Sequence, residues 1–321
     1  MKYGQVIGVD FGTTNFIAYL KDKGSILCEP AVAAVERETG QVLAVGENAR
    51  KRMRAYPERY DAAYPVSEGL IYDYKTASEM LGVFLRKLTQ KKLLKPKVVV
   101  GIPIRAGEVA RRAMVNAALD GGAVTAKALS EPFAAAAGIG LDLSSGKSAM
   151  IIDIGGGTTD ISVISMGKVA LGTSLSSAGK KMDRAVYRLV REEDSLEIGE
   201  KAAEQLKISG GTLTREKAPT TLHVYGRNVK TGLPDHGEIT SDLILEALRP
   251  VADEIAAAAI RALDRSPREV VNEVVESGVY LTGGGSAIPG MDAYLGERIG
   301  ISCHNVKNPL HSVAVGAGIW E

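Results

Sequence analysis

The sequence is poor in the residues that mark several large classes of protein. It has only two cysteines, Cys28 and Cys303, and their positions fit neither a disulfide framework nor a zinc motif. Its four histidines form no HExxH motif. No apolar run reaches the ~18 residues that cross a bilayer, and no signal-peptide pattern precedes the first strand. We therefore expect a cytoplasmic protein of a reducing compartment with no transmembrane helix.

An excess of charge of one sign is lacking too. Lys and Arg number 39 against 38 Asp and Glu, which gives a formal net charge of +1, and aromatic residues make up 5% of the chain. Nucleic-acid binding usually needs a basic surplus and aromatic side chains on which bases stack. We therefore expect no nucleic-acid partner. At 321 residues the chain is long enough for two domains, each with its own core.

The sequence does contain a repeated pattern in which an apolar strand leads into an acid, a glycine turn and two threonines. The first copy is Val6-Ile-Gly-Val-Asp-Phe-Gly-Thr-Thr-Asn15, and the second is Met150-Ile-Ile-Asp-Ile-Gly-Gly-Gly-Thr-Thr-Asp160. Each is typical of a β-hairpin. Glycine lets backbone N–H groups approach an anion, and the threonine hydroxyls add donors. Either copy alone could be an ordinary hairpin, but the repeat predicts a duplicated domain that grips a phosphate chain between its halves.

Two further features accompany the repeat. An acid inside an apolar strand, as at Asp153, costs several kcal/mol unless it faces a cation, so we expect a solvated metal there. A third glycine turn, Val279-Tyr-Leu-Thr-Gly-Gly-Gly-Ser286, follows another apolar strand and lacks the acid. It suits a less charged part of the same ligand, such as a nucleoside.

Hydrophobic periodicity and glycine and proline positions predict the remaining elements. The segment 60–74 is expected to be irregular, and two small-residue helices, 132–140 and 312–319, are expected to pair and let two halves shear. The other predicted helices span 47–54, 75–88, 107–120, 180–193, 199–207, 242–265 and 291–299. In the helix 199–207, Glu204 and Lys207 share a face, whose ordinary interpretation is a solvated surface.

In this order, the two Asp–Gly–Thr-Thr motifs, Glu131-Pro132 with its small-residue helix, Leu281-Thr-Gly-Gly-Gly285 and the terminal Ala/Gly helix resemble the actin-like ATPase superfamily. That superfamily contains actins, heat-shock chaperones and sugar kinases. Glu29-Pro30 and Tyr225-Gly-Arg-Asn-Val-Lys-Thr-Gly-Leu-Pro234 are similar to the MreB family of bacterial rod-shape-determining proteins within it.

The resemblance implies an α/β fold in which the actin-like domain is duplicated. Each of the two domains would hold a mixed sheet flanked by helices, with nucleotide in the cleft between them. The implied first domain covers 1–140 and 303–321, with a small subdomain at about 31–64. The implied second domain covers 141–302, with a small subdomain at about 176–247.

The resemblance also assigns roles within an ATP site with bound Mg²⁺. The β- and γ-phosphates would be held by Gly12, Thr13, Thr14, Asn15, Gly155, Gly156, Gly157 and Thr158. Asp10 and Asp153 would hold hydrated Mg²⁺, while Glu131 and Thr158 would orient the attacking water. Glu204 and Lys207 would touch the ribose and adenine, with Gly283, Gly284 and Gly285 behind the base.

Several positions depart from the usual pattern of the family. Ser130-Glu131 replaces two acids, Gly179-Lys180 replaces Gly-Asp, Thr14 replaces alanine and Asp160 replaces glutamate. These changes leave the phosphate cradle complete. Lys180 is expected on the side used for filament contacts, so it bears on polymerisation.

The family's partners are implied in the same way. They are the chain itself in antiparallel double filaments, the inner face of the cytoplasmic membrane, and cell-wall-synthesis and shape-complex proteins. Because only Met1-Lys-Tyr-Gly4 precedes the first predicted strand, we expect no anchoring amphipathic helix there. Leu93 and Leu94, flanked by lysines, are therefore candidates for a membrane anchor, or else they cap the core beneath the next strand.

Three functions compete. We expect an ATPase that forms membrane-associated filaments and organises cell-wall synthesis, with magnetosome or plasmid-segregation filaments as alternatives of the same class. A chaperone would need a substrate-binding domain beyond Glu321. A non-polymerising ATPase or small-molecule kinase would need its own general base, and no second acid beyond Asp10, Glu131 and Asp153 is apparent.

Overall fold

The computed structural model describes residues 4–90, 95–142, 146–215 and 218–320. The chain forms two compact units. Unit 1 is Met1–Gly146 with Leu310–Glu321, and unit 2 is Lys147–Pro309. The chain therefore leaves unit 1 for unit 2 and returns for its last helix.

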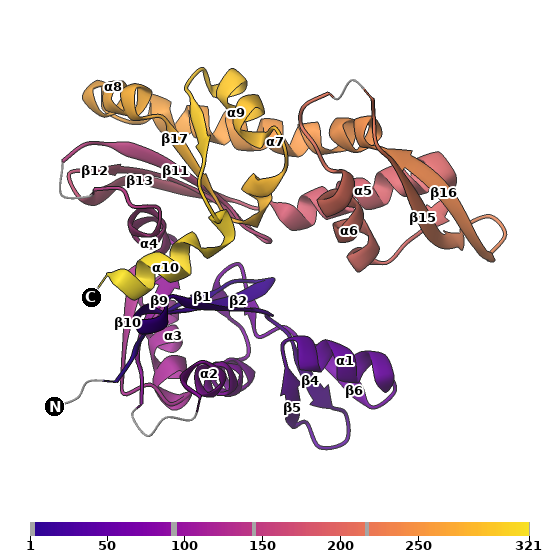
Figure 1. The fold of residues 1–321 in the computed structure, drawn as a ribbon, viewed down its shortest axis with the longest axis horizontal. Coiled ribbons are helices and arrows are strands. Elements are labelled where there is room, and N and C mark those ends of the chain that lie inside the picture. Colours follow the sequence, from indigo (N-terminus) through magenta and orange to yellow (C-terminus); the bar gives the residue numbers. More distant parts are fainter. Residues whose placement is uncertain (1–3, 91–94, 143–145, 216–217, 321) are drawn as a thin grey trace. The chain divides into compact units, whose positions relative to one another are not determined.

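Unit 1 is built on a five-stranded mixed sheet in the order β10-β9-β1-β2-β3 (Figure 1). β1 is antiparallel to β2 and parallel to β9, and β10 is parallel to β9. The strands are β1 Val6–Phe11, β2 Asn15–Leu20, β3 Ser25–Pro30, β9 Lys97–Ile102 and β10 Thr125–Ser130. The hairpin predicted at the first glycine turn is confirmed.

Successive residues of β1 point to opposite faces of this sheet, and helices cover both faces. Ile7 and Val9 point into a core formed with α2 (Tyr74–Thr89) and α3 (Glu108–Asp120). Gly8 faces the other way, where a β-carbon would lie 2.1 Å from the carbonyl oxygen of Ala314 in α10 (Ser312–Ile319). Only glycine leaves room for that approach.

The two small-residue helices, α4 (Glu131–Gly138) and α10, pack directly on each other within unit 1. A β-carbon on Gly316 would lie 1.6 Å from the Ala134 carbonyl oxygen. Their predicted pairing is therefore confirmed. Their role in a shearing motion stays a prediction.

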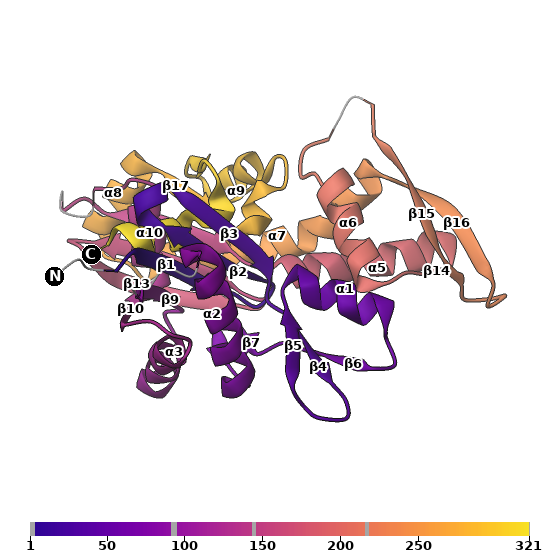
Figure 2. The ribbon, with the colours of Figure 1, turned by 60° about the horizontal axis from the view of Figure 1, so that its bottom comes forward.

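A smaller sheet, β5-β4-β6, lies beside helix α1 in unit 1 (Figure 2). The elements are β4 Ala33–Glu36, β5 Val42–Val45, α1 Glu47–Ala55 and β6 Tyr60–Ala63. The expectation of an irregular segment 60–74 was wrong, because β6 pairs with β4 and a short ladder joins β7 (Val66–Ser67) to β8 (Leu70–Ile71).

Unit 2 repeats the topology of the large sheet, with strands in the order β13-β12-β11-β17-β18. β11 is antiparallel to β12 and parallel to β17, and β17 is parallel to β18, which are the relationships of β1, β2, β9 and β10. The strands are β11 Ala149–Ile154, β12 Thr159–Ser165, β13 Lys168–Leu175, β17 Val279–Thr282 and β18 Cys303–Asn305. The predicted duplication of a mixed sheet is confirmed.

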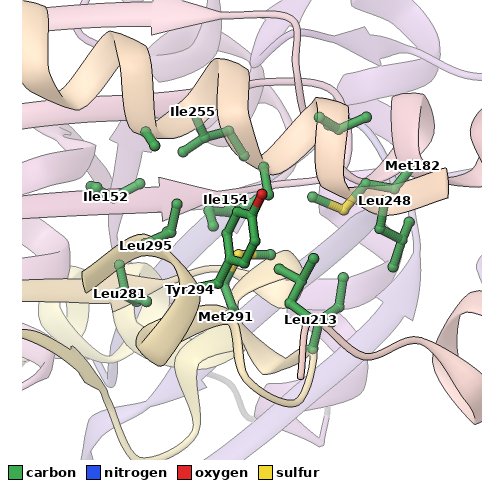
Figure 3. Packing of buried hydrophobic residues seen from close by; sticks show 14 of the residues in the cluster. Ile152, Ile154, Met182, Leu213, Leu248, Ile255, Leu281, Met291, Tyr294 and Leu295 are labelled. Carbon is green, nitrogen blue, oxygen red and sulfur yellow. The ribbon is translucent and has the colours of Figure 1, made fainter. Parts of the chain in front are cut away.

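The core of unit 2 lies between this sheet and the helices packed on it. Three helices of this unit are α7 Ser241–Asp264, α8 Arg268–Ser277 and α9 Met291–Ile299, and α7 and α9 contribute many of the buried side chains. Figure 3 shows Ile152 and Ile154 of β11 in one buried cluster with Tyr294 and Leu295 of α9. The Tyr294 hydroxyl donates to Asp253 Oδ1 at 2.7 Å, which satisfies the one polar atom of this ring.

The rest of unit 2 forms a second small sheet, β14-β15-β16, packed with α5 and α6 (Figure 1). These elements are α5 Gly179–Asp194, β14 Leu196–Glu197, α6 Glu200–Gly210, β15 Thr221–Asn228 and β16 Pro234–Thr240. Short 3₁₀ turns occur at η1 Lys21–Lys23, η2 Gly284–Ala287 and η3 Pro309–His311. Cys28 and Cys303 are both free thiols.

Candidate phosphate-binding site

The first glycine turn closes the hairpin β1–β2 at the carboxyl edge of the parallel strands of unit 1. The Gly12 amide donates to the Asn15 carbonyl at 3.0 Å, which fixes the turn. The Thr14 hydroxyl is buried and has no hydrogen-bond partner among the described residues. A buried hydroxyl without a partner is costly, so it is suited to a ligand oxygen.

A contact that sequence analysis missed supports this turn. The backbone N–H of Glu68 donates to Thr13 Oγ1 at 2.8 Å, across 55 positions of sequence. The Thr13 hydroxyl accepts this bond, so its own hydrogen stays available to donate. Glu68 has a positive φ of 51°, and its carboxylate accepts from Arg105 at 2.7 Å. The β7–β8 ladder therefore orients Thr13.

Two acids lie at the same edge of the sheet in unit 1. Asp10 is next to the last residue of β1, and Glu131 begins α4 directly after β10. Burial raises the pKa of Asp10 to about 7, so a cation near it would be needed to keep it charged at neutral pH. A β-carbon at Gly101 would lie 3.2 Å from Glu131 Cγ, so this glycine makes room for the glutamate.

The second glycine turn caps a helix. Gly179 and Lys180 at the start of α5 donate their amides to the carbonyls of Gly155 and Gly156 at 3.0 and 2.8 Å. The N-cap residue Ala178 makes no side-chain cap, so the turn carbonyls take that place. Thr158 Oγ1 donates to Asp160 Oδ2 at 3.3 Å. The position of this turn therefore depends on the position of α5.

The third glycine turn lies directly beside the second, because β17 pairs with β11 and Thr282 pairs with Asp153. Gly283 has a φ of +79°, and a β-carbon there would lie 2.3 Å from Asp153 Oδ1. At Gly285 it would lie 2.4 Å from the Ile154 side chain. The Asp153 carboxylate thus lies next to the backbone of the turn Gly283–Gly285, whose three glycines carry no side chains.

Lys207 of α6 reaches the same part of unit 2. Its Nζ lies 2.7 Å from Asp183 Oδ1 and 3.5 Å from the Gly179 carbonyl, and both side chains are mostly buried. Burial raises the pKa of Asp183, the bond from Lys207 lowers it, and Glu204 raises it further. Lys207 is therefore an ion-pair partner, which the interpretation as a solvated face did not include.

The structure thus gathers the candidate residues into two groups. Unit 1 holds Asp10, Gly12, Thr13, Thr14, Asn15 and Glu131, and unit 2 holds Asp153, Gly155, Gly156, Gly157, Thr158, Glu204, Lys207, Gly283, Gly284 and Gly285. Leu93 and Leu94 lie outside the described residues.

The chemistry of these groups suits a hydrated ion and a phosphate chain. Across the described ranges, no three His, Cys, Asp or Glu side chains are arranged to hold a metal ion. Hydrated Mg²⁺ needs only one or two carboxylates beside phosphate oxygens. The glycine turns and the Thr14 hydroxyl supply the close approach and the donors that phosphates need. No helix in the described part of the chain is long and apolar enough to cross a membrane.

Comparison with known proteins identifies the family. The family model described as MreB/Mbl protein matches residues 4–321. The cell shape-determining protein Mbl of Bacillus cereus is 38% identical over 99% of this chain and 96% of its own length. The cell shape-determining protein MreB of Escherichia coli K12 is 34% identical over 97% of this chain and 92% of its own length.

Solved structures agree with this result. MreB5 of Spiroplasma citri, crystallised with ADP, superimposes with a TM-score of 0.92 at 28% identity, covering 99% of this chain and 96% of its own. The MamK double helical filament gives a TM-score of 0.82 at 22% identity over 98% and 97%, a likeness of fold alone. The fold is therefore actin-like, and the chain belongs to the MreB/Mbl family.

Proposed function

We propose that this chain binds ATP with Mg²⁺ through its two strand–acid–glycine turns, hydrolyses it slowly, and polymerises as a cytoskeletal protein that helps determine cell shape. The observation that carries the proposal is the equivalence of the two turns. Each unit has an equivalent five-stranded sheet. In both sheets an acid lies near the end of the first strand, β1 or β11, directly before a glycine turn. A nucleotide bound by both turns would therefore be held by residues of both units.

Each side chain then has a distinct task. Asp10 and Asp153 would hold the hydration shell of Mg²⁺, and the ion would neutralise charge on the β- and γ-phosphates. The turn amides and the hydroxyls of Thr13 and Thr14 would fix the phosphate oxygens, and the Thr158 hydroxyl would join them by giving up its bond to Asp160. Glu131 would accept a hydrogen bond from the attacking water. Lys207, Glu204 and the turn Gly283–Gly285 would hold the nucleoside.

The test of this nucleotide role is calorimetric titration of ATP with and without Mg²⁺. We expect saturable binding to one site that weakens at least tenfold without Mg²⁺. Absence of binding by folded protein would contradict the proposal. Phosphate release measured under the same conditions tests the hydrolysis step.

Filament formation is proposed from the family. Two relatives carry the name cell shape-determining protein, and a structural neighbour is a double helical filament. Antiparallel double filaments are the expected arrangement, and cell-wall-synthesis and shape-complex proteins are the expected partners. Sedimentation with Mg²⁺–ATP, with and without lipid, measures polymerisation. A chain that binds and hydrolyses ATP yet stays monomeric in every condition would instead be a non-polymerising ATPase or kinase.

Membrane association is proposed through Leu93 and Leu94. Burying two leucines contributes roughly 3–5 kcal/mol, and each nearby lysine adds about 1 kcal/mol on anionic lipid. One subunit would bind marginally, whereas a filament would bind with many copies at once. Flotation of polymerised Leu93→Ser/Leu94→Ser with anionic vesicles should show loss of binding, and unchanged flotation would remove these residues from that role.

A further inference from the structure

Outside the residues assigned above, unit 2 holds a second cluster of polar side chains, formed by Ser177, Lys181 and Glu254. The Ser177 hydroxyl donates to a Glu254 carboxylate oxygen, and Lys181 Nζ donates to the same oxygen. Lys181 Nζ also donates to Ser177 Oγ at 3.2 Å. We name these three residues the Ser177 cluster. It joins the start of α5 to the middle of α7.

The cluster combines a buried hydroxyl with a reachable ion pair. Ser177 is only 4% exposed, whereas the side chains of Lys181 and Glu254 are 40% and 48% exposed. The bonds from Lys181 and Ser177 lower the pKa of Glu254, so the carboxylate stays charged at neutral pH. Hydrogen bonds to a charged group are the stronger kind, so this carboxylate is well suited to fix the serine.

From Ser177 two sets of backbone contacts lead to the second glycine turn. The Ser177 carbonyl accepts from Thr159 Oγ1 at 2.7 Å, and Thr159 is fully buried next to Thr158. The following residues, Gly179 and Lys180, donate to the carbonyls of Gly155 and Gly156. The segment 177–180 therefore contacts Gly155 and Gly156 of the turn, and Thr159 at the start of the strand that follows the turn.

We propose that the Ser177 cluster is a positioning device that holds the start of α5 on α7 and thereby sets the place of the Gly155–Gly157 turn. This deepens the proposed function, because on that function the turn receives the phosphates. None of the three side chains is among the residues to which the proposed function gives a contact with the nucleotide. They act through the backbone of 177–180, and their loss leaves the phosphate donors present but less well placed.

Two measurements test the proposal, and the first needs no nucleotide. In nucleotide-free protein, amide hydrogen exchange across 177–182 should speed up at least tenfold in Lys181→Met and in Glu254→Gln. The matched control is Arg188→Met, which removes an exposed cation two turns later on the same helix. It should leave exchange in this segment unchanged. Equal exchange in wild type and both cluster variants would overturn the proposal.

The second measurement is the affinity for Mg²⁺–ATP. We expect the dissociation constant to rise about tenfold in Lys181→Met and Glu254→Gln, and to stay within about threefold of wild type in Lys181→Arg, which keeps the charge. If wild type binds ATP and all variants bind equally well, the cluster has no positioning role. If wild type binds no ATP, the proposed function fails, while the exchange measurement still decides whether the cluster holds α5.

If Glu254→Gln folds poorly, the decisive variant is Lys181→Glu/Glu254→Lys, in which the two charges are swapped. Recovery of slow exchange in this pair relative to Lys181→Glu alone supports the link between α5 and α7. No recovery in a folded double variant contradicts it.

Discussion

Gly283 lies so close to Asp153 that a β-carbon on the glycine would come within 2.3 Å of the carboxylate Oδ1. Its φ of +79° adds backbone strain to any substitution. The third glycine turn therefore sets the position of the acid in the second. This contact links the proposed nucleoside and metal sites within one unit.

We predict that Gly283→Ala lowers both stability and nucleotide affinity. Strain and the displaced carboxylate should cost about 1–3 kcal/mol, a fall in Tm of several degrees. ATP affinity should fall in the presence of Mg²⁺, measured by titration. The matched control is Gly300→Ala, whose φ is +77° with no atom within 4 Å of the added carbon. It should lower Tm alone, and unchanged ATP affinity in folded Gly283→Ala would contradict the assignment of Asp153.

Asp10 gives the nucleotide-free protein a distinct pH dependence. Burial raises its pKa from 3.8 to about 7, so folding favours the protonated acid. The protonated carboxyl therefore contributes to the free energy of unfolding in full below pH 3.8, and this contribution is lost as the pH rises through about 7. Asp10 is half-buried, so the change in the free energy of unfolding across this range should be about 1–3 kcal/mol.

Asp10→Asn should therefore be more stable than wild type at pH 8 and nearly equal at pH 4. Denaturant unfolding of both proteins without nucleotide measures this difference. The same variant should lose Mg²⁺-dependent ATP affinity. A stability difference that does not change with pH would show that Asp10 titrates normally.

Glu131→Gln should slow hydrolysis without weakening binding. Glutamine keeps the shape at the start of α4 but is a neutral and weaker acceptor for the hydrogen bond of the attacking water, and a poorly placed reactant can cost about 10²-fold in rate. Steady-state phosphate release should fall about 10²-fold with an ATP dissociation constant within twofold of wild type. Glu108→Gln, an exposed acid at the start of α3, is the control. Equal hydrolysis would remove Glu131 from its role.

Variants of the Lys207–Asp183 ion pair distinguish the effect of Lys207 on stability from its effect on ATP affinity. Lys207→Met leaves a mostly buried carboxylate without its cation and should destabilise the protein by about 2–4 kcal/mol. Adding Asp183→Leu should recover most of that loss, because the pair is then replaced by apolar groups. ATP affinity should stay low in both variants. Full recovery of affinity in the double variant would show that Lys207 does not contact the nucleotide.

Local sequence patterns predicted the parts of the fold that depend on local interactions. The hairpins at Gly12 and Gly155 were predictable because alternation and turn glycines lie within one short segment. β10 was missed because Thr125-Ala-Lys-Ala-Leu-Ser130 has little β-propensity, and parallel pairing with β9 forms it. α8 (Arg268–Ser277) was missed because it follows α7 after a very short break.

In the candidate site, too, local motifs were predictable and long-range contacts were not. The acids and glycines were recognisable as motifs, and the resemblance supplied their roles. The contact of Glu68 with Thr13 and the link from Ser177 to Glu254 join residues 55 and 77 positions apart. No periodicity or spacing encodes such pairs, because only the folded backbone brings them together.

On the proposed function, Asp10 and Asp153 both act on one metal-bound ATP. A double-mutant cycle in Mg²⁺-dependent ATP affinity tests it most directly, with Asp10→Asn, Asp153→Asn and the double variant titrated under identical conditions. We expect each single change to raise the dissociation constant for Mg²⁺–ATP at least tenfold, and the double variant to bind little worse than either single variant. Losses that multiply, or a single change without effect in folded protein, would mean that the two acids do not share an ion.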